Sequence, residues 1–403
     1  MSSERYRARG VSPQKEDVHA AIAGEAPGLY PGAFCKLVPD VLTGSAAHCL
    51  AMHADGAGTK AAVAYLMYRE TGDPAVFRGI AQDAVVMNTD DLLCVGATGP
   101  FLFSNTIGRN PHHIPGEVLR ELVRGYAQMA DQFADWGMQL HLTGGETADV
   151  GDLTRTLIVD ATAAVRLARS DVIDNTGVRP GDVIIGLAAD GQAAWEARPN
   201  SGIGSNGLTS ARHDLLHADY ARDYPESHAP HLPADLRYSG THHLGDALPG
   251  SDLTVGEALL SPTRSYAPLL RPLLAEHRPL IRALVHCTGG GQTKCRHAGR
   301  DIRYVKDRLF DPPALFAEIR RVTGTPWAEL YQVFNMGHRM EVIGDAALLP
   351  ILEDLGRAHG VAVRRVGHCE AMPAGAGNTV MLHAPDGEMV HYPSTLGGAQ
   401  AAD

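Results

Sequence analysis

The sequence predicts an α/β protein with two domains, and three observations lead to this prediction. The chain has 403 residues, which is longer than most single hydrophobic cores. Short apolar runs typical of strands alternate with helical stretches in both halves. Several of the predicted strands are followed by glycine-rich loops, in which the backbone can turn sharply and approach a ligand closely.

Composition and charge exclude several classes of function. The net charge of -11, from 35 basic and 46 acidic residues, argues against a nucleic-acid surface and against binding to anionic membranes. The charged N-terminus has no apolar core behind it, so we expect no secretory signal, and no apolar run approaches the ~20 residues of a membrane span. The six cysteines are scattered without a CxxC pair, which indicates buried thiols and a cytoplasmic location.

The first predicted domain comprises residues 1–169. Its elements are a strand at 46–52, helices at 61–69 and 80–95, a strand at 101–107, a helix at 115–136, and strands at 139–142 and 157–165. The helix at 115–136 has the clearest apolar periodicity in the chain, with Pro115 in its first turn and Gly137 after its end. The strand at 139–142 runs into a loop that holds Gly144, Gly145 and Glu146.

The stretch from His53 to Lys60 joins the first strand to the first helix. It gathers Asp55, Gly56, Gly58, Thr59 and Lys60, of which Asp55 could hold a metal ion and Lys60 a phosphate. The helix that follows would present free N–H groups to an anion. The alternative is an ordinary glycine-rich turn with two solvated charges.

Three acidic residues lie on the apolar helix at 80–95. Asp83 and Asp90 are seven residues apart and therefore about 20° apart around the helix axis, and Asp91 follows. Because an unpaired buried carboxylate is costly, these acids need partners, and a divalent metal would supply one. The alternative is that they face solvent or an arginine.

The second predicted domain comprises residues 170–403. It contains strands at 183–189, 281–285, 341–343 and 361–366, helices at 208–217, 268–276 and 313–322, and a hairpin around residues 385–387. One glycine cluster, Ser201 to Gly207, precedes the helix at 208–217, and a second, His286 to Gly291, follows the strand at 281–285. Residues 220–260 are polar and rich in histidine and proline, as in an elaborated loop or an insertion, and we place this insertion near 213–260.

Six motifs in this order resemble the phosphoribosylformylglycinamidine cyclo-ligase (AIR synthetase) family. They are DGAGTK at 55–60, DD-x4-GA at 90–97, GGETAD at 144–149, SNG at 205–207, HCTGGG at 286–291 and FNMGHRM at 334–340. The resemblance covers roughly residues 6–370. It implies an N-terminal sheet that forms a barrel across a homodimer, a C-terminal α/β sandwich, and ATP-dependent closure of an imidazole ring on a small-molecule ribonucleotide through an iminophosphate.

The resemblance also implies site residues. ATP or phosphate would be bound by Gly56, Gly58, Thr59, Lys60, Gly144, Gly145, Ser205, Asn206, Gly207, Gly289, Gly290 and Gly291. Mg²⁺ would be held by Asp55, Asp83, Asp90, Asp91 and Glu146. Lys60, Asp91 and His286 would act in catalysis, with His286 moving a proton or, alternatively, serving as a hydrogen-bonded structural histidine.

The chain departs from the family pattern at several positions. Gly204 stands where the family often has histidine, Asp90 replaces an asparagine, and His338 and Arg339 replace small residues. These departures leave alternatives open: another ATP-using enzyme of the same superfamily, a cyclase of specialised metabolism, or an ATP-binding paralogue without catalysis.

Overall fold

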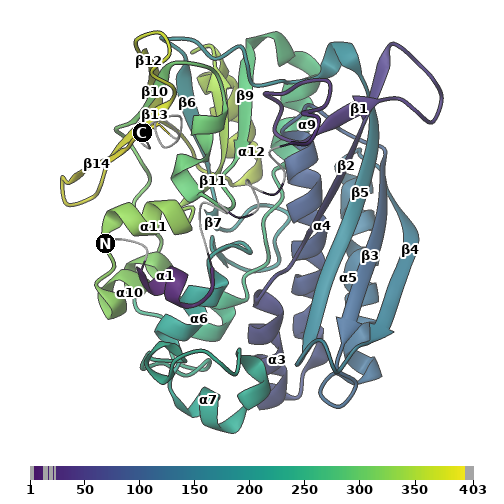
Figure 1. The fold of residues 1–403 in the computed structure, drawn as a ribbon, viewed down its shortest axis with the longest axis vertical. Coiled ribbons are helices and arrows are strands. Elements are labelled where there is room, and N and C mark those ends of the chain that lie inside the picture. The colour runs from purple at the N-terminus through teal and green to yellow at the C-terminus, as the bar shows by residue number, and fades with distance from the viewer. Residues whose placement is uncertain (1–3, 12–16, 18–20, 22–23, 395–403) are drawn as a thin grey trace.

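The computed structural model describes residues 4–11, 17, 21 and 24–394. Its elements form a mixed α/β fold with one sheet in each half of the chain (Figure 1), which confirms the predicted fold class. The first sheet is drawn from residues 37–168 and the second from residues 183–392. Among the described residues, no helix is both long and apolar enough to cross a membrane.

The N-terminal sheet has five strands in the order β1-β2-β5-β3-β4. Their bounds are β1 (Leu37–Pro39), β2 (His48–Gly56), β3 (Phe101–Arg109), β4 (Leu140–Asp149) and β5 (Leu157–Ala168). All neighbours are antiparallel except β3 and β4, which run parallel. Alternation along β5 buries every odd residue from Leu157 to Leu167 and turns the even ones away from the core.

Helices α3 (Lys60–Thr71), α4 (Phe77–Leu93) and α5 (Gly116–Asp135) complete the first half. α4 packs on β2 and β5 and also contacts α9 and β9 of the second half, so it lies between the two sheets (Figure 1). This position explains why α4 is apolar nearly all round: both of its sides are covered by protein. Asp83, Asp90 and Asp91 are therefore buried.

The second sheet has seven strands in the order β14-β13-β10-β12-β6-β11-β9. Their bounds are β6 (Val183–Ala188), β9 (Ile281–His286), β10 (Ile302–Lys306), β11 (His338–Gly344), β12 (Val363–Ala371), β13 (Thr379–His383) and β14 (Met389–Tyr392). β13 and β14 form the hairpin predicted around residues 385–387. A separate two-residue pair joins β7 (Asp190–Gly191) and β8 (Asn200–Ser201).

The helices of the second half are mostly short. They are α6 (Leu208–Leu215), α7 (Asp219–Asp223), α8 (Val255–Leu259), α9 (Ala267–Glu276), α10 (Ala314–Thr323), α11 (Trp327–Val333) and α12 (Leu348–His359). At the N-terminus of the chain, α1 (Glu4–Ala8) lies beside α6 and α10 (Figure 1).

The insertion at 213–260 is more structured than a polar loop. It contains the end of α6, all of α7 and α8, and two single 3₁₀ turns, Pro225–Ser227 and Ala234–Leu236. Thr254 and Glu257 form a capping box at the start of α8, which satisfies the first N–H groups of that helix.

One predicted loop is wrong. Residues 144–149, expected to follow a short strand, are the second half of β4 and pair with β3. Gly145 permits this pairing, because a Cβ there would lie only 2.1 Å from the carbonyl oxygen of Asn105. The glycine signal that predicted a loop marks a close approach of two strands instead.

Candidate functional site

A cavity of about 250 Å³ lies where three of the glycine-rich loops meet. Gly58 and Thr59 belong to the first half of the chain, whereas Gly207, Gly289 and Gly290 belong to the second half. The remaining lining residues are Tyr6, Val11, Ser205, Asn206, Leu208, Thr209, Gln332 and Val333. The cavity is slightly smaller than a typical small-ligand pocket of about 300–1,000 Å³. Its walls thus come from segments far apart in sequence.

Gly207 shapes the wall of this cavity beside α6. It adopts the left-handed conformation, with φ of 77°, and α6 starts at the next residue. A Cβ at this position would lie 2.3 Å from the ring of Phe334, so only glycine fits without a shift of that ring. Gly207, Leu208 and Thr209 line the cavity, so the N-terminal end of α6 forms part of its wall. The first N–H groups of a helix have no partner within the helix, and helix N-termini bind anions for this reason. Asn206 adds a buried side-chain oxygen with no hydrogen-bond partner among the described residues.

Four of the predicted phosphate-binding glycines do not line the cavity. Gly56 is the last residue of β2, Gly144 and Gly145 lie in the exposed strand β4, and Gly291 is buried against the backbone of Tyr331. Their assignment to phosphate binding stays a prediction.

Lys60 is completely buried at the start of α3, with a relative exposure of 0%. Its ammonium group donates to Asp83 Oδ1 at 2.9 Å, to the carbonyl of Gly204 at 3.1 Å and to the carbonyl of Ser261 at 2.5 Å. Burial lowers the pKa of Lys60, and the charge of Asp83 opposes that shift. Three protein acceptors use the three N–H donors, so no donor is left for a phosphate in this conformation.

Asp83, the ion-pair partner of Lys60, also binds a segment of the second half of the chain. Its Oδ1 also accepts from the backbone N–H of Thr263 at 2.7 Å and from the hydroxyl of Thr263 at 2.6 Å. Its Oδ2 is buried and has no hydrogen-bond partner among the described residues. Lys60 and Asp83 thus form a buried ion pair that joins α3 and α4 to the loop at 261–263.

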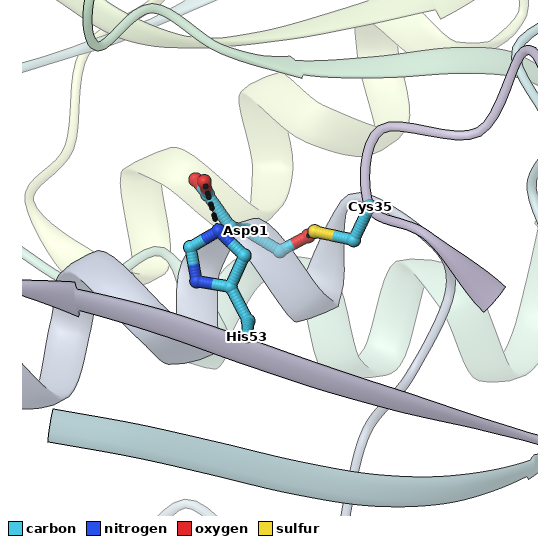
Figure 2. A group of neighbouring side chains, drawn as sticks. All are labelled: Cys35, His53 and Asp91. Carbon is cyan, nitrogen blue, oxygen red and sulfur yellow. Dashed lines mark hydrogen bonds and ion pairs between the residues drawn. The ribbon is translucent and has the colours of Figure 1, made fainter. Parts of the chain in front are cut away.

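Asp91 is held by two histidines. Figure 2 shows His53 of β2 facing the side chain of Asp91 of α4, and it shows the sulfur of Cys35 next to the backbone of Asp91. His53 Nε2 lies 3.2 Å from Asp91 Oδ2, and His286 Nδ1 lies 2.6 Å from Asp91 Oδ1. The Cys35 thiol donates to the carbonyl oxygen of Asp91 at 3.3 Å. Both carboxylate oxygens are therefore engaged by imidazoles.

The electrostatics of this group follow from its burial and its hydrogen bonds. Burial would raise the pKa of Asp91, but the hydrogen bonds from His286 and His53 outweigh that effect and lower it. For His53, desolvation opposes protonation, yet the hydrogen bond to Asp91 and its charge raise the pKa above 6.5. Burial dominates at His286 and lowers its pKa to about 4. Asp91 is thus ionised at neutral pH and His286 is neutral.

Arg339 contacts the other face of His286. Its Nε donates to His286 Nε2 at 3.0 Å, which assigns the ring proton of neutral His286 to Nδ1. Arg339 also donates to the carbonyl of Arg264 and lies over the ring of Tyr266, with 5.5 Å between the guanidinium carbon and the ring centroid. In the part of the chain that the structure describes, no carboxylate forms an ion pair with this arginine, although it is only 2% exposed.

The glycine at position 204 makes room for Arg339. A Cβ on Gly204 would lie 3.0 Å from Arg339 Nη1 and 3.3 Å from its Cδ. Two of the departures from the family pattern are therefore linked in space: the glycine at 204 leaves the room that the arginine at 339 occupies. Both were visible in the sequence, but nothing in it indicated that they touch.

Asp90 points to the second half of the chain. It accepts from the Ser265 hydroxyl at 2.8 Å and from the backbone N–H of Tyr266 at 3.0 Å. Burial raises the pKa of Asp90 to about 7, and the nearby charge of Arg339 limits the rise. Asp90 is thus partly protonated near neutral pH, although it is completely buried.

The five predicted metal ligands do not converge on one point within a single chain. Alternation places Asp55 of β2 on the helix-covered face of the sheet and Glu146 of β4 on the open face. The two residues are three strand spacings apart, roughly 14 Å. Asp55 is half-buried and accepts from the N–H of Gly56 at 2.7 Å, whereas Glu146 is exposed. Among the described residues, the one possible metal-binding group that includes any of the five combines Asp91 with Cys35 and His53.

Comparisons with known proteins agree on the family to which these features point. Residues 39–165 match the family model described as AIR synthase related protein, N-terminal domain. Phosphoribosylformylglycinamidine cyclo-ligase from Methanothermobacter thermautotrophicus is 32% identical over 289 residues, which cover 72% of this chain and 71% of that protein. The enzyme of the same name from Thermococcus gammatolerans is 30% identical over 301 residues, covering 75% of this chain and 72% of its own.

Solved structures support the fold alone. A chain of a HypE–HypF complex matches with a TM-score of 0.54 and 14% identity, covering 94% of this chain and 99% of that chain. The hydrogenase maturation protein HypE matches with a TM-score of 0.52 and 14% identity, covering 87% of this chain and 89% of that one.

Proposed function

This chain belongs to the phosphoribosylformylglycinamidine cyclo-ligase family, a family of ligases in purine biosynthesis, and we propose that it uses ATP to convert formylglycinamidine ribonucleotide into 5-aminoimidazole ribonucleotide. The observation that supports this most directly is the cavity at which Gly58, Ser205–Gly207 and Gly289–Gly290 meet. These segments carry three of the motifs by which the sequence resembles the family, and they are distant from one another in the chain.

The proposed reaction has two bond-forming steps. The formyl oxygen of the substrate attacks the γ-phosphorus of ATP, and the bond between the γ-phosphorus and ADP breaks. The formamide nitrogen loses its proton as its C=N bond forms, which gives an iminophosphate and ADP. An amidine nitrogen then forms a C–N bond to the activated carbon, the C–O bond breaks, and phosphate leaves with the oxygen. The attacking nitrogen loses one proton as the ring closes. Phosphoryl transfer of this kind depends mainly on positioning and on neutralising charge.

The cavity fits the phosphate end of a nucleotide. The N–H groups at the start of α6 and the glycine backbone at Gly58 and Gly290 offer donors without side chains in the way. Gly58 has open space around its Cα, and Gly290 adopts the left-handed conformation with φ of 93°. We assign phosphate binding to these backbone groups and to Ser205 and Asn206.

Lys60, Asp91 and His286 support the reaction indirectly in this proposal. Each is buried and has its polar atoms engaged by other protein groups, so none is free to take a proton or to touch a phosphate in the described conformation. We assign Lys60 to the contact between the two halves, and Asp91 and His286 to the orientation of Arg339. Arg339 then supplies a buried positive charge behind the loop at 204–207, close to the phosphate-binding backbone.

Mg²⁺ would be held by carboxylates with access to the nucleotide, and it would neutralise phosphate charge. Asp55 precedes the cavity-lining Gly58 by three residues and is half-buried, so it is the first candidate. Glu146 lies on the open face of the sheet, from which it would reach a nucleotide only across a subunit interface. Asp83, Asp90 and Asp91 would need to exchange protein donors for the metal.

A second copy of the chain would cover the open face of the N-terminal sheet. Met52, Leu102 and Ile158 project from the face opposite α4 and α5, with exposures of 72%, 52% and 49%. Apolar residues from neighbouring strands of one sheet mark an interaction surface. We propose a homodimer in which two such sheets pack together, and a cytoplasmic enzyme whose six cysteines are free and buried.

The direct test is an assay of the purified protein with formylglycinamidine ribonucleotide, ATP and Mg²⁺. We expect ATP cleavage that depends on the ribonucleotide, with equal amounts of ADP and 5-aminoimidazole ribonucleotide. Gly207→Ala, which places a methyl group against Phe334, should reduce this turnover, whereas Gly245→Ala, at a position with open space, should not. ATP cleavage without the ring product would indicate another ATP-using reaction, and no cleavage would contradict the proposal.

A further inference from the structure

Two histidines and an aspartate of the insertion come together on the surface, away from the cavity. In this group, the His217 cluster, Nδ1 of His217 lies 3.1 Å from Oδ2 of Asp219, and Nε2 of His243 lies 3.6 Å from the same oxygen. The three atoms lie within 4.8 Å of one another. His243 is exposed and the other two are partly exposed. The cluster belongs to the segment around α7, at the lower end of the molecule in Figure 1.

The backbone holds the cluster together without help from the side chains. Residues 216–217 and 240–242 form short parallel bridges. The N–H of His217 donates to the carbonyl of His242 at 2.8 Å, and the N–H of Gly240 donates to the carbonyl of Leu216 at 3.0 Å. His217 and His243, 26 residues apart, are thus fixed next to each other, and Asp219 is fixed as the first residue of α7.

Other charged groups orient the three side chains. Arg222 binds the second oxygen of Asp219, with 2.7 Å between Nη1 and Oδ1, which leaves Oδ2 directed at the histidines. Asp246 Oδ2 accepts from the backbone N–H of His243 at 2.7 Å and lies 3.9 Å from its Nδ1. At 3.9 Å this carboxylate is too far from Nδ1 to accept a hydrogen bond, so its effect on the ring is electrostatic.

The distances fit a small transition-metal ion. With ligands at about 2.0–2.1 Å in tetrahedral geometry, two ligand atoms lie roughly 3.4 Å apart. The two separations from Asp219 Oδ2, 3.1 Å to His217 and 3.6 Å to His243, lie on either side of that value. Two imidazoles and one carboxylate favour Zn²⁺ over Mg²⁺ or Ca²⁺, which prefer oxygen ligands. The backbone N–H of Asp219 donates weakly to His217 Nδ1 at 3.3 Å, and a metal would displace this contact.

We propose that His217, Asp219 and His243 bind one Zn²⁺ ion, with water in the remaining position. The ion clamps α7 to the segment around residue 243 and so fixes the insertion. Tyr220 links this region to the first half of the chain, because its hydroxyl donates to Glu70 at 2.6 Å and accepts from the N–H of Leu244 at 2.9 Å. The site is independent of the ring-closing reaction proposed above.

The test titrates the metal-free, full-length protein with Co²⁺ as a spectroscopic probe, in excess Mg²⁺, and then displaces Co²⁺ with Zn²⁺. We expect one bound Co²⁺ per chain, a visible d–d band and no thiolate charge-transfer band. His217→Ala and His243→Ala should each abolish the band, and Asp246→Asn should weaken binding by less than either, because Asp246 acts on His243 only through its charge. His231→Ala is the matched control, because His231 is an exposed histidine of the same insertion outside the cluster.

Three results would overturn the assignment. They are no Co²⁺ binding by the unaltered protein, unchanged binding in His243→Ala, and a thiolate band. Such a band would place the metal at one of two buried groups with a cysteine, which are Cys35, His53 and Asp91 or Cys287, His338 and Glu341. Circular dichroism of each variant establishes that it is folded, and His243→Gln provides a second variant of the same ligand with a smaller change in polarity. Because Co²⁺ binding is measured without substrate, its outcome does not depend on whether the chain closes the imidazole ring.

Discussion

Replacing Lys60 by methionine separates its two possible roles, a structural ion pair and a phosphate ligand. The change keeps most of the side-chain volume and removes the charge. It would leave the carboxylate of Asp83 buried with only the two donors of Thr263. Breaking a buried pair by removing one partner costs about 3–5 kcal/mol, a large part of the 5–15 kcal/mol that stabilises a typical protein. We therefore expect Lys60→Met to lower the urea midpoint of unfolding strongly.

Tryptophan fluorescence during urea unfolding follows the contact between the two halves of the chain. Trp136, which caps the C-terminus of α5, and Trp195 of the second half have ring centroids 5.8 Å apart, so tryptophan fluorescence reports their separation. Lys36→Met is the matched control: the ion pair of Lys36 with Glu25 is exposed, and we expect a change of no more than about 0.5 kcal/mol.

A double variant distinguishes the loss of the ion pair from the burial of an unpaired charge. In Lys60→Met with Asp83→Leu, both charges are absent, and well-packed apolar replacements of a buried pair are often neutral or stabilising. The double variant should therefore regain most of the lost stability. If Lys60→Met instead kept the stability of the unaltered protein while losing turnover, the structural role would be refuted and Lys60 would be a phosphate ligand.

Four further predictions follow from the site. Arg339→Met should lower kcat about 100-fold or more, and it should also lower stability by about 1–3 kcal/mol, because the buried acceptors His286 Nε2 and the carbonyl of Arg264 lose their donor; retained turnover would contradict the proposed role of the charge. Because the pKa of His286 falls from 6.5 to about 4 on folding, the unfolded chain binds more protons at this residue between these values, and His286 should make the protein roughly 1 kcal/mol less stable at about pH 5.5 than at about pH 8. Asp90, whose pKa rises to about 7, acts in the opposite direction, so urea unfolding of the unaltered protein is compared with that of His286→Gln at both pH values, and an equal pH dependence in the two would contradict the prediction. Gly207→Ala should cost about 1–3 kcal/mol in thermal unfolding and raise KM for ATP, and a variant as stable as the unaltered protein would exclude the clash with Phe334. Leu102→Asp should convert the dimer into monomers in sedimentation velocity, and an unaltered protein that is monomeric at all concentrations would exclude the proposed interface.

Local patterns in the sequence predicted most of the fold. The apolar periodicity of residues 115–136 became α5, and the continuous apolar run of residues 80–95 became α4, the helix between the sheets. β4 was missed because glycines were interpreted as a loop signal. Their function there depends on Asn105 in the neighbouring strand, which local sequence does not reveal.

The partners of the buried charges could not be predicted in the same way. The acids on α4 were expected to need partners, and a metal ion was one solution. The structure offers another: Lys60 for Asp83, Ser265 for Asp90, and two histidines for Asp91. Ser265 is 175 residues from its partner in sequence, and His286 is 195.

Protein donors and a metal cation satisfy the same electrostatic requirement, so composition and spacing alone cannot distinguish them. The two kinds of partner differ in whether a carboxylate oxygen is still accessible to a metal ion. A carboxylate whose oxygens already accept from protein N–H groups must lose those bonds before it binds Mg²⁺, and their loss opposes metal binding. Asp55 also accepts from the N–H of Gly56, but it is partly exposed and Glu146 is fully exposed, so water can reach both residues and replace any bond that metal binding breaks. Asp55→Asn should therefore raise the Mg²⁺ concentration needed for half-maximal turnover, whereas Asp83→Asn should act mainly on stability, and the reverse pattern would return the metal site to α4.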